Sequence, residues 1–396
     1  MAKLYRERRL QIIFAVTLMG VMGVSLISPV FPAVRQHFGI TEQQVGLVVT
    51  AYTLPGVIVA LLIGVLADRY GRKRVLLPLL VLFGLAGAGG AFAPNFESLL
   101  AFRALQGVGG AGLVTLSTTL IGDYYDGAQR GAAMGLNASI LSIATAAYPL
   151  LGGLVGTIGW WAPFLLFALA VPVAIWALVS LVEPQAEDSV PFREYLSRVG
   201  AIAASGDTIV AAFAGFLAFV LLYGGILTYF PILLKQRFSA SSVIIGALQS
   251  AMAMVVAIVS SQTGRLVKRF SERSLFTVGF LGYGVGLLLI PFVGSLVWFL
   301  VPMAIFGLGH GLVIPNVQTF MTKLAPGQFR AATMSLYNIA LRLGQTLGPL
   351  VFGAASVFGF TQVFLLAGVI AFVGYGVLAV SLYFRFPAIT NRGSSK

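Results

Sequence analysis

Residues 64–74 read Gly-Val-Leu-Ala-Asp-Arg-Tyr-Gly-Arg-Lys-Arg, a short charged stretch between two long apolar runs. A weaker copy, Gly-Arg-Leu-Val-Lys-Arg-Phe-Ser-Glu-Arg, returns 200 positions later at residues 264–273. Other stretches repeat at the same offset: residues 130–134 are echoed by residues 330–334, and Pro149 is matched by Pro349. The spacing indicates a duplicated chain whose halves each carry a charged hairpin at an equivalent place.

The composition is that of a protein built for lipid. Of the 396 residues, 58% are hydrophobic and only 9% are charged, whereas soluble chains carry about 25% charged residues. The chain has no cysteine, which excludes disulfides, thiolate metal ligands and cysteine nucleophiles.

Twelve apolar runs reach the length of about 20 residues that a helix needs to cross a bilayer. They lie at 10–33, 44–66, 75–93, 97–121, 131–156, 161–182, 207–232, 242–266, 274–293, 296–321, 331–356 and 361–384. A polar stretch at 183–206 falls at the midpoint. We therefore predict an all-α polytopic membrane protein with two pseudo-symmetric six-helix bundles, 1–182 and 207–396, joined by a cytoplasmic linker, 183–206.

The basic residues predict the orientation. With the N-terminus inside, 20 of the 25 lysines and arginines fall on the cytoplasmic side, three lie outside (Arg35, Lys235 and Arg237), and two lie within spans (Arg103 and Arg342). Cytoplasmic loops of membrane proteins are enriched in Lys and Arg. The net charge of +13 is thus a topology signal and does not indicate nucleic-acid binding. We expect a multi-pass protein of the cell (inner or plasma) membrane with both termini cytoplasmic.

Two similar bundles with matching hairpins are typical of a transporter that rocks around a site between the halves. A channel is the alternative, because twelve helices could also enclose a pore. An enzyme is not expected, because the chain shows no metal-ligand spacing, no nucleophile motif and no catalytic acid pair.

The twelve spans, the repeat and the hairpin together resemble the major facilitator superfamily, and within it the twelve-span drug:proton antiporter group. The superfamily's hairpin motif is close to G-x-L-A-D-R-x-G-R-[RK]-[RK], which residues 64–74 match. A second motif, R-x-x-Q-G, appears at residues 103–107. The antiporter motif of span five, close to G-P-x-x-G-G, appears at residues 148–153 with Tyr148 in place of its first glycine.

The resemblance implies a conformational latch at the cytoplasmic surface, in which Asp68 docks against the start of span eleven when the protein opens outward. A helix N-terminus carries a partial positive charge that favours such a carboxylate. The expected latch residues are Gly64, Asp68, Arg69, Gly71, Arg72, Asp123 and Arg330. The alternative is that Asp68 and Arg72 pair locally, which contributes about 0–1 kcal/mol at a surface.

Charged and polar residues within the spans are the candidates for substrate binding or coupling. A charge in hydrocarbon is costly, so Arg103 and Arg342 should face the protein interior, each with a glutamine (Gln106 or Gln345) one helical turn away. Arg103 could alternatively serve only to bond backbone carbonyls. His310 is a candidate proton carrier, because histidine titrates near neutral pH, or else a packing residue. The remaining candidates in this set are Tyr148 and Asn316.

No Asp or Glu lies near the middle of any predicted span. The interior charges are two arginines, so we expect a neutral, zwitterionic or anionic amphipathic substrate, exported by a monomer in exchange for protons. No cofactor is expected, and the proton gradient is the expected energy source. The alternatives are a lipid or glycolipid flippase and an importer of sugars or organic acids.

Overall fold

The computed structural model describes residues 4–183, 206–324 and 330–385, and every regular element in this part of the chain is helical. The N-terminal elements are η1 (Leu4–Arg6), α1 (Arg8–Ser25), η2 (Ser28–Val30), α2 (Phe31–Phe38), α3 (Glu42–Tyr70), α4 (Arg72–Gly89), η3 (Gly90–Phe92), α5 (Phe96–Gly110), α6 (Leu113–Tyr124), α7 (Gly127–Val155), α8 (Ala162–Leu165), η4 (Leu166–Leu169) and α9 (Ala170–Ser180).

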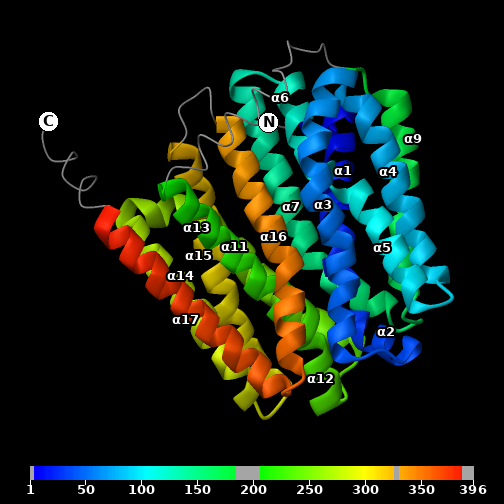
Figure 1. Cartoon of the computed structure of the whole chain (residues 1–396). Coiled ribbons are helices and arrows are strands. Elements are labelled where there is room, and N and C mark those ends of the chain that lie inside the picture. Colours follow the sequence, from blue (N-terminus) through cyan, green and yellow to red (C-terminus); the bar gives the residue numbers. More distant parts are fainter. Residues whose placement is uncertain (1–3, 184–205, 325–329, 386–396) are drawn as a thin grey trace, which may run out of the picture.

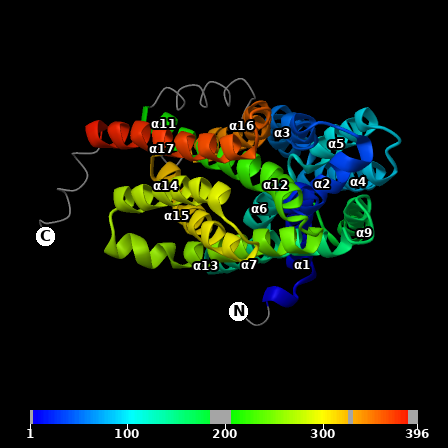
Figure 2. The ribbon, with the colours of Figure 1, turned by 90° about the horizontal axis from the view of Figure 1, so that it is seen from below.

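The C-terminal elements are α11 (Gly206–Val220), η5 (Leu221–Tyr229), α12 (Phe230–Phe238), α13 (Ser242–Arg269), α14 (Glu272–Leu289), η6 (Ile290–Phe292), η7 (Val297–Phe299), α15 (Leu300–Leu324), α16 (Arg330–Ser356) and α17 (Phe360–Arg385). Figure 1 shows the two groups side by side as tilted bundles, and Figure 2 shows the same arrangement from below. The predicted fold class is confirmed.

Eleven helical segments of the described residues are long and apolar enough to cross a membrane. The remaining predicted span, 331–356, corresponds to α16, which has 27 residues and is therefore about 40 Å long, but carries Arg342, Gln345 and Thr346. Helix α16 packs against α3 and α11. The count of twelve helices is thus consistent with the structure.

Several predicted span boundaries need correction. The span predicted at 97–121 is two helices, α5 and α6, which meet at Ala111 and Gly112. The span predicted at 207–232 continues to Phe238 and contains a π-helix, η5, over Leu221–Tyr229. The linker boundaries at 183 and 206 stay a prediction, because residues 184–205 lie outside the described part of the chain.

The duplication is visible at the helix ends. Helices α2 and α12 end at Gly39 and Ser239, which both have the left-handed backbone conformation (φ 62° and 53°). The helices that follow, α3 and α13, both begin at a capping hydroxyl, Thr41 or Ser241, whose side chain accepts a backbone N–H. Such a cap satisfies one of the free N–H groups at a helix start. Equivalent turns therefore place equivalent helices in the two halves.

The duplication extends to the packing inside each bundle. A Cβ added at Gly107 would lie 2.0 Å from the carbonyl oxygen of Tyr52, and one added at Gly307 would lie 2.7 Å from that of Met252. Each pair of positions is related by the same 200-residue offset. These glycines let two helix backbones approach closely, which is how helices associate in lipid.

Candidate functional site

The two bundles meet along two helix pairs, α3 with α16 and α7 with α13. A Cβ at Gly46 would lie 2.9 Å from the carbonyl oxygen of Pro349, and one at Gly246 would lie 2.2 Å from that of Pro149. Both residues of one contact are 200 positions from their counterparts in the other. The two seams are therefore equivalent under the internal repeat, as a rocking interface requires.

Hydrogen bonds tie the seams together. Thr50 donates to the carbonyl oxygen of Thr346 (3.1 Å), and the hydroxyls of Thr346 and Thr53 are 2.9 Å apart. On the other seam the backbone N–H of Leu150 donates to Ser250 (3.0 Å). Thr50 and Ser250 are again equivalent positions.

A third contact lies beside the π-helix. Ser28 of η2 donates to the carbonyl oxygen of Leu227 (2.5 Å), and Gln249 of α13 donates to the Ser28 hydroxyl (2.8 Å) and to the carbonyl oxygen of Ile226 (2.9 Å). The Ser28 and Gln249 side chains are both buried. These hydrogen bonds join α13 and η5 of one bundle to η2 of the other.

These contacts lie in the part of the interface nearest one end of the molecule. We call it the sealed end, residues 28–46 and 228–246, and we call the opposite end, with residues 64–74 and 264–272, the hairpin end. At the hairpin end Gly64 and Gly264 are exposed, and a Cβ on either would meet nothing within 4 Å. The described bundles are thus closed at the sealed end and open toward the hairpins, and α2 and α12 lie together at the closed end (Figure 1).

Arg342 lies where the packed interface stops. Its Nη2 donates to the carbonyl oxygen of Ala111 (2.5 Å), at the break between α5 and α6 of the opposite bundle. A Cβ at Gly56 would lie 2.4 Å from Nη1. Of the hydrogen bonds between the bundles described above, this one lies closest to the hairpin end. Arg342 therefore forms the floor of the opening, with Gln345 half-buried one turn further along α16.

Two tyrosines flank this arginine. Tyr52 of α3 lies within electrostatic range of both Arg103 and Arg342, and Tyr223 of η5 lies within range of Tyr52 and Arg342. The Tyr223 ring stacks on Phe219 at 5.7 Å. Both tyrosines thus lie near the arginine that bonds across the interface in the described chain.

Arg103 has a different environment. It is 1% exposed, and its guanidinium donates to the carbonyl oxygens of Val48 (3.2 Å) and Gly23 (3.0 Å) and to Gln106 (2.5 Å). It also lies over the Tyr52 ring at 4.3 Å. The guanidinium thus joins α1, α3 and α5 within one bundle. This geometry favours a structural role, and contact of Arg103 or Gln106 with substrate stays a prediction.

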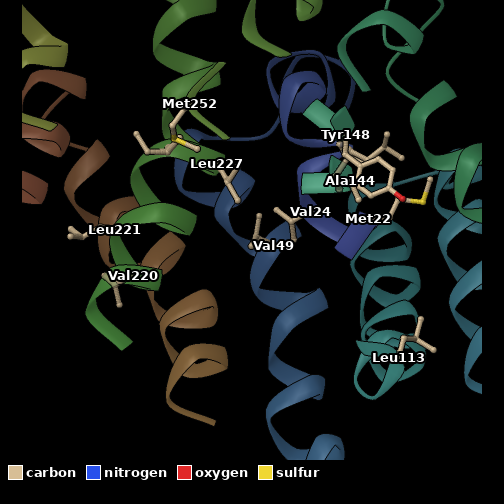
Figure 3. Close-up of a cluster of buried hydrophobic side chains, with 14 of the residues drawn as sticks. Met22, Val24, Val49, Leu113, Ala144, Tyr148, Val220, Leu221, Leu227 and Met252 are labelled. Atoms are coloured by element: carbon tan, nitrogen blue, oxygen red, sulfur yellow. The ribbon is translucent and has the colours of Figure 1, made fainter. Parts of the chain in front are cut away.

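Tyr148 also bonds within its own bundle. Its hydroxyl donates to the carbonyl oxygen of Leu18 (2.9 Å) and the residue is 7% exposed. Figure 3 shows this ring on the N-terminal side of a buried apolar cluster, together with Met22, Val24 and Val49, while Leu221, Leu227 and Met252 come from the C-terminal bundle. The surroundings of the interface are therefore mainly apolar.

His310 lies inside the C-terminal bundle. Its Nδ1 is 2.8 Å from the Tyr283 hydroxyl, and its ring lies close to those of Phe306 and Phe219. Asn316 on the same helix donates to the carbonyl oxygen of Leu312 (2.7 Å), and its Oδ1 is buried without a partner among the described residues. Neither side chain reaches Arg342 by a recorded contact, so the predicted residues form more than one cluster.

The predicted latch residues form a local network in this open state. Arg72 pairs with Asp68 (2.7 Å) and with Asp123 (3.2 Å), and Arg69 lies over the Tyr70 ring. Arg330 begins α16, and its side chain lies outside the described part of the chain. The local pairing is present, and the latch between bundles stays a prediction for the state that is closed at this end.

Glu183 is a member of this network that sequence reasoning missed. Its carboxylate accepts the backbone N–H groups of Lys73 (3.1 Å) and Arg74 (3.3 Å), and so caps the start of α4. Gly71, with φ of 101°, makes the turn, and a Cβ there would lie 2.6 Å from the carboxylate. The start of the predicted linker is therefore fastened to the hairpin.

Tyr125 ties the N-terminal segment to the same end. Its hydroxyl donates to the Glu7 carboxylate (2.8 Å). Burial, and then this hydrogen bond, raise the pKa of Tyr125 above its usual value. The tyrosine therefore stays neutral over the physiological pH range and acts as a permanent donor to Glu7.

The fold and the interface are those of a membrane transporter built from two similar helical bundles. The family model of the Major Facilitator Superfamily matches residues 13–349 and 212–395. The chain belongs to this superfamily, and it is a transporter and not an enzyme.

Similar curated proteins include exporters and resistance proteins. The chain is 27% identical to the bacillibactin exporter of Bacillus subtilis (strain 168) over 361 residues, which covers 86% of this chain and 88% of that protein. It is 26% identical to the class C tetracycline resistance protein of Escherichia coli, with 86% and 87% coverage. The predicted resemblance to drug efflux proteins is confirmed.

Among solved structures, a bacterial homolog of the human lysosomal transporter Spinster, in an inward-facing and unoccupied conformation, is similar with a TM-score of 0.80 and 19% identity. The match covers 95% of this chain and 97% of that one. At this identity the likeness supports the fold alone. The chain is a multi-span membrane protein, and the plasma membrane is the location that fits its relatives.

Proposed function

We propose that the chain exports a small amphipathic compound, neutral, zwitterionic or anionic, by alternating access in exchange for protons. The relatives named as an exporter and as a resistance protein support export. The opening toward the hairpin end supports loading from the side on which most basic residues lie, which the positive-inside rule makes the cytoplasm.

The observation that carries the proposed charge preference is the position of Arg342. Its guanidinium has five N–H donors, and the one bond recorded for it among the described residues goes to a neutral carbonyl, that of Ala111. A carboxylate or phosphate oxygen makes a stronger, charge-assisted bond with guanidinium than a carbonyl does. An anionic group that enters from the hairpin end can therefore take the place of Ala111.

The remainder of the proposed substrate would contact apolar and aromatic side chains of the protein. Tyr52 and Tyr223 lie within electrostatic range of the guanidinium, and both bundles contribute buried apolar side chains to a cluster between them (Figure 3). A cationic substrate finds no counter-charge here, because all twelve acidic residues lie outside the middle of the predicted spans. Release of Arg342 from Ala111 also removes a contact between the bundles, which couples binding to movement.

Proton exchange is the second part of the proposal. His310 is the span residue whose ordinary pKa lies closest to neutral pH, and its bond to Tyr283 gives a proton a defined acceptor or donor. Because His310 lies inside the C-terminal bundle, its protonation would act on the packing of α15 against α14 and not on the substrate directly.

Transport by proteoliposomes with an imposed pH gradient tests the proposal. We expect anionic and neutral amphiphiles to be carried faster than cationic ones of the same apolar size. The substitution R342Q should reduce transport of the anion more than tenfold, while R237Q, which removes an arginine at the sealed end, should leave it unchanged. H310F should uncouple transport from the gradient.

Equal transport of cations and anions by the parent would contradict the charge preference. Gradient-driven transport that persists in H310F would contradict the role of His310, and a rate that rises without saturation would indicate a channel instead of a carrier.

A further inference from the structure

A hollow of ≈ 400 Å³ lies at the sealed end between α2 and α12. Its walls repeat the duplication, since Pro32, Arg35 and Gln36 of one bundle line it together with the equivalent Ile232, Lys235 and Gln236 of the other. Helices α2 and α12 contact each other here, at the bottom of Figure 1. The hollow therefore lies where equivalent residues of the two bundles face each other, at the sealed end.

The basic residues around this hollow are exceptions to the concentration of Lys and Arg on the cytoplasmic side. Of the 25 basic residues, three are predicted to lie on this side of the membrane, and Arg35 and Lys235 are two of them. Arg35 is 3.4 Å from Glu42, but its Nε is buried without a hydrogen-bond partner among the described residues. Lys235 is exposed, and within the described chain it has no acidic partner.

We propose that this hollow binds a phosphate group, free or on a lipid headgroup, between Arg35 and Lys235. A phosphate presents several strong acceptor oxygens and can engage both cations at once. Pro32 and Ile232 give the rest of an amphipathic molecule an apolar wall. The carboxylate of Glu42, which also accepts from Gln236, opposes the anion and limits its affinity.

Such a site controls the conformation. Its two cations come from different bundles, and they face one hollow because the sealed end is closed. A ligand that binds one state better than another shifts the population toward it. Phosphate in this hollow therefore holds the sealed end closed and the hairpin end open, and its release permits the opposite state. This site is separate from the central one at Arg342.

Labelling of a single introduced cysteine tests the proposal, because the natural chain has none. Thr50, buried in the α3–α16 seam, serves as the reporter position in the variant T50C, which reacts with a maleimide only when the sealed end opens. In purified full-length protein in a non-ionic detergent, inorganic phosphate at constant ionic strength should slow the labelling in a saturable way. The readout requires no transport, so its failure and a failure of the proposed function are distinguishable.

Matched variants locate the site. K235Q should weaken the apparent affinity for phosphate about fivefold or more. R237Q removes the same charge two residues away on α12, where Arg237 donates to the carbonyl oxygen of Pro291, and should leave the affinity unchanged. E42Q removes the opposing carboxylate and should tighten binding. Lys235 is the primary test because it is exposed, whereas R35Q also breaks a pair with Glu42.

The two sources of phosphate are separated by lipid nanodiscs without added inorganic phosphate, which contain either phosphatidylglycerol or a galactolipid whose headgroup has no phosphate. Slower labelling in phosphatidylglycerol alone identifies a lipid headgroup as the ligand, and slower labelling with inorganic phosphate in detergent identifies a free anion. Labelling rates that respond to neither source, or that respond equally in K235Q and in the parent, would overturn the proposal.

Discussion

The contact between Gly246 and Pro149 offers the sharpest test of the closed seam. A Cβ added at Gly246 would lie 2.2 Å from the backbone carbonyl oxygen of Pro149, whereas ordinary contacts begin at 3.4 Å. The obstacle is backbone and cannot rotate away. The substitution G246A therefore requires α7 and α13 to separate by about 1 Å at this point.

The cost can be estimated from the packing of protein interiors. Forcing one extra carbon into a well-packed interface costs about 1–3 kcal/mol. This cost applies to the state with the seam closed and is absent when the seam is open. The population with an open sealed end should therefore rise by about 5- to 150-fold.

The T50C reporter on the other seam measures this shift, because it is remote from the substitution and becomes reactive when the sealed end opens. We expect G246A to raise the maleimide reaction rate by a factor in that range. The matched control is G264A, on the same helix, where an added Cβ meets nothing within 4 Å. A labelling rate in G246A equal to that in G264A would refute the inference that this contact closes the sealed end.

Three further substitutions have defined outcomes. R103M removes three hydrogen bonds from a buried guanidinium and should lower the unfolding free energy by about 2–4 kcal/mol. The Tm should fall, while the KM of the folded fraction should stay unchanged. A changed KM at an unchanged Tm would instead indicate that Arg103 contacts the substrate. Q249L removes the hydrogen bonds to Ser28 and to the π-helix and should raise the labelling rate of the T50C reporter about tenfold. An unchanged rate would contradict a role of these hydrogen bonds in closing the sealed end. G71A places a side chain at φ of 101° and should lower the Tm by a few degrees, corresponding to about 1–2 kcal/mol, whereas G64A, in open space, should not; equal Tm values would contradict the strain argument.

The fold was predictable because its two determinants are properties of the sequence. Length and apolarity define the spans, and the 200-residue offset predicts that equivalent residues pack equivalently. Gly107 lies against Tyr52 and Gly307 lies against Met252, as the repeat requires. The span at 331–356, which is α16, was predicted as an apolar run despite Arg342, and the repeat gives it a counterpart in the first half.

The candidate site was less predictable, because the rotation of each helix decides which way a side chain points. Arg103 and Arg342 have similar sequence settings, with a glutamine three residues on, yet one bonds within its bundle and the other reaches the opposite bundle. The π-helix Leu221–Tyr229 contains Tyr223, which lies within electrostatic range of Arg342. Such a helix has no local sequence signal, and here its Gly224 packs against Gly348 and Phe352 of α16.

The most direct test of the account is a pair of distances measured by double electron–electron resonance. One spin-label pair is placed at the hairpin end, at Gly64 and Gly264, and the other at the sealed end, at Gln36 and Gln236. On addition of a transported anion and a pH gradient, we expect the hairpin-end distance to shorten while the sealed-end distance lengthens. Two distances that stay fixed, or that change in the same direction, would contradict two bundles that rock about the seam at Arg342.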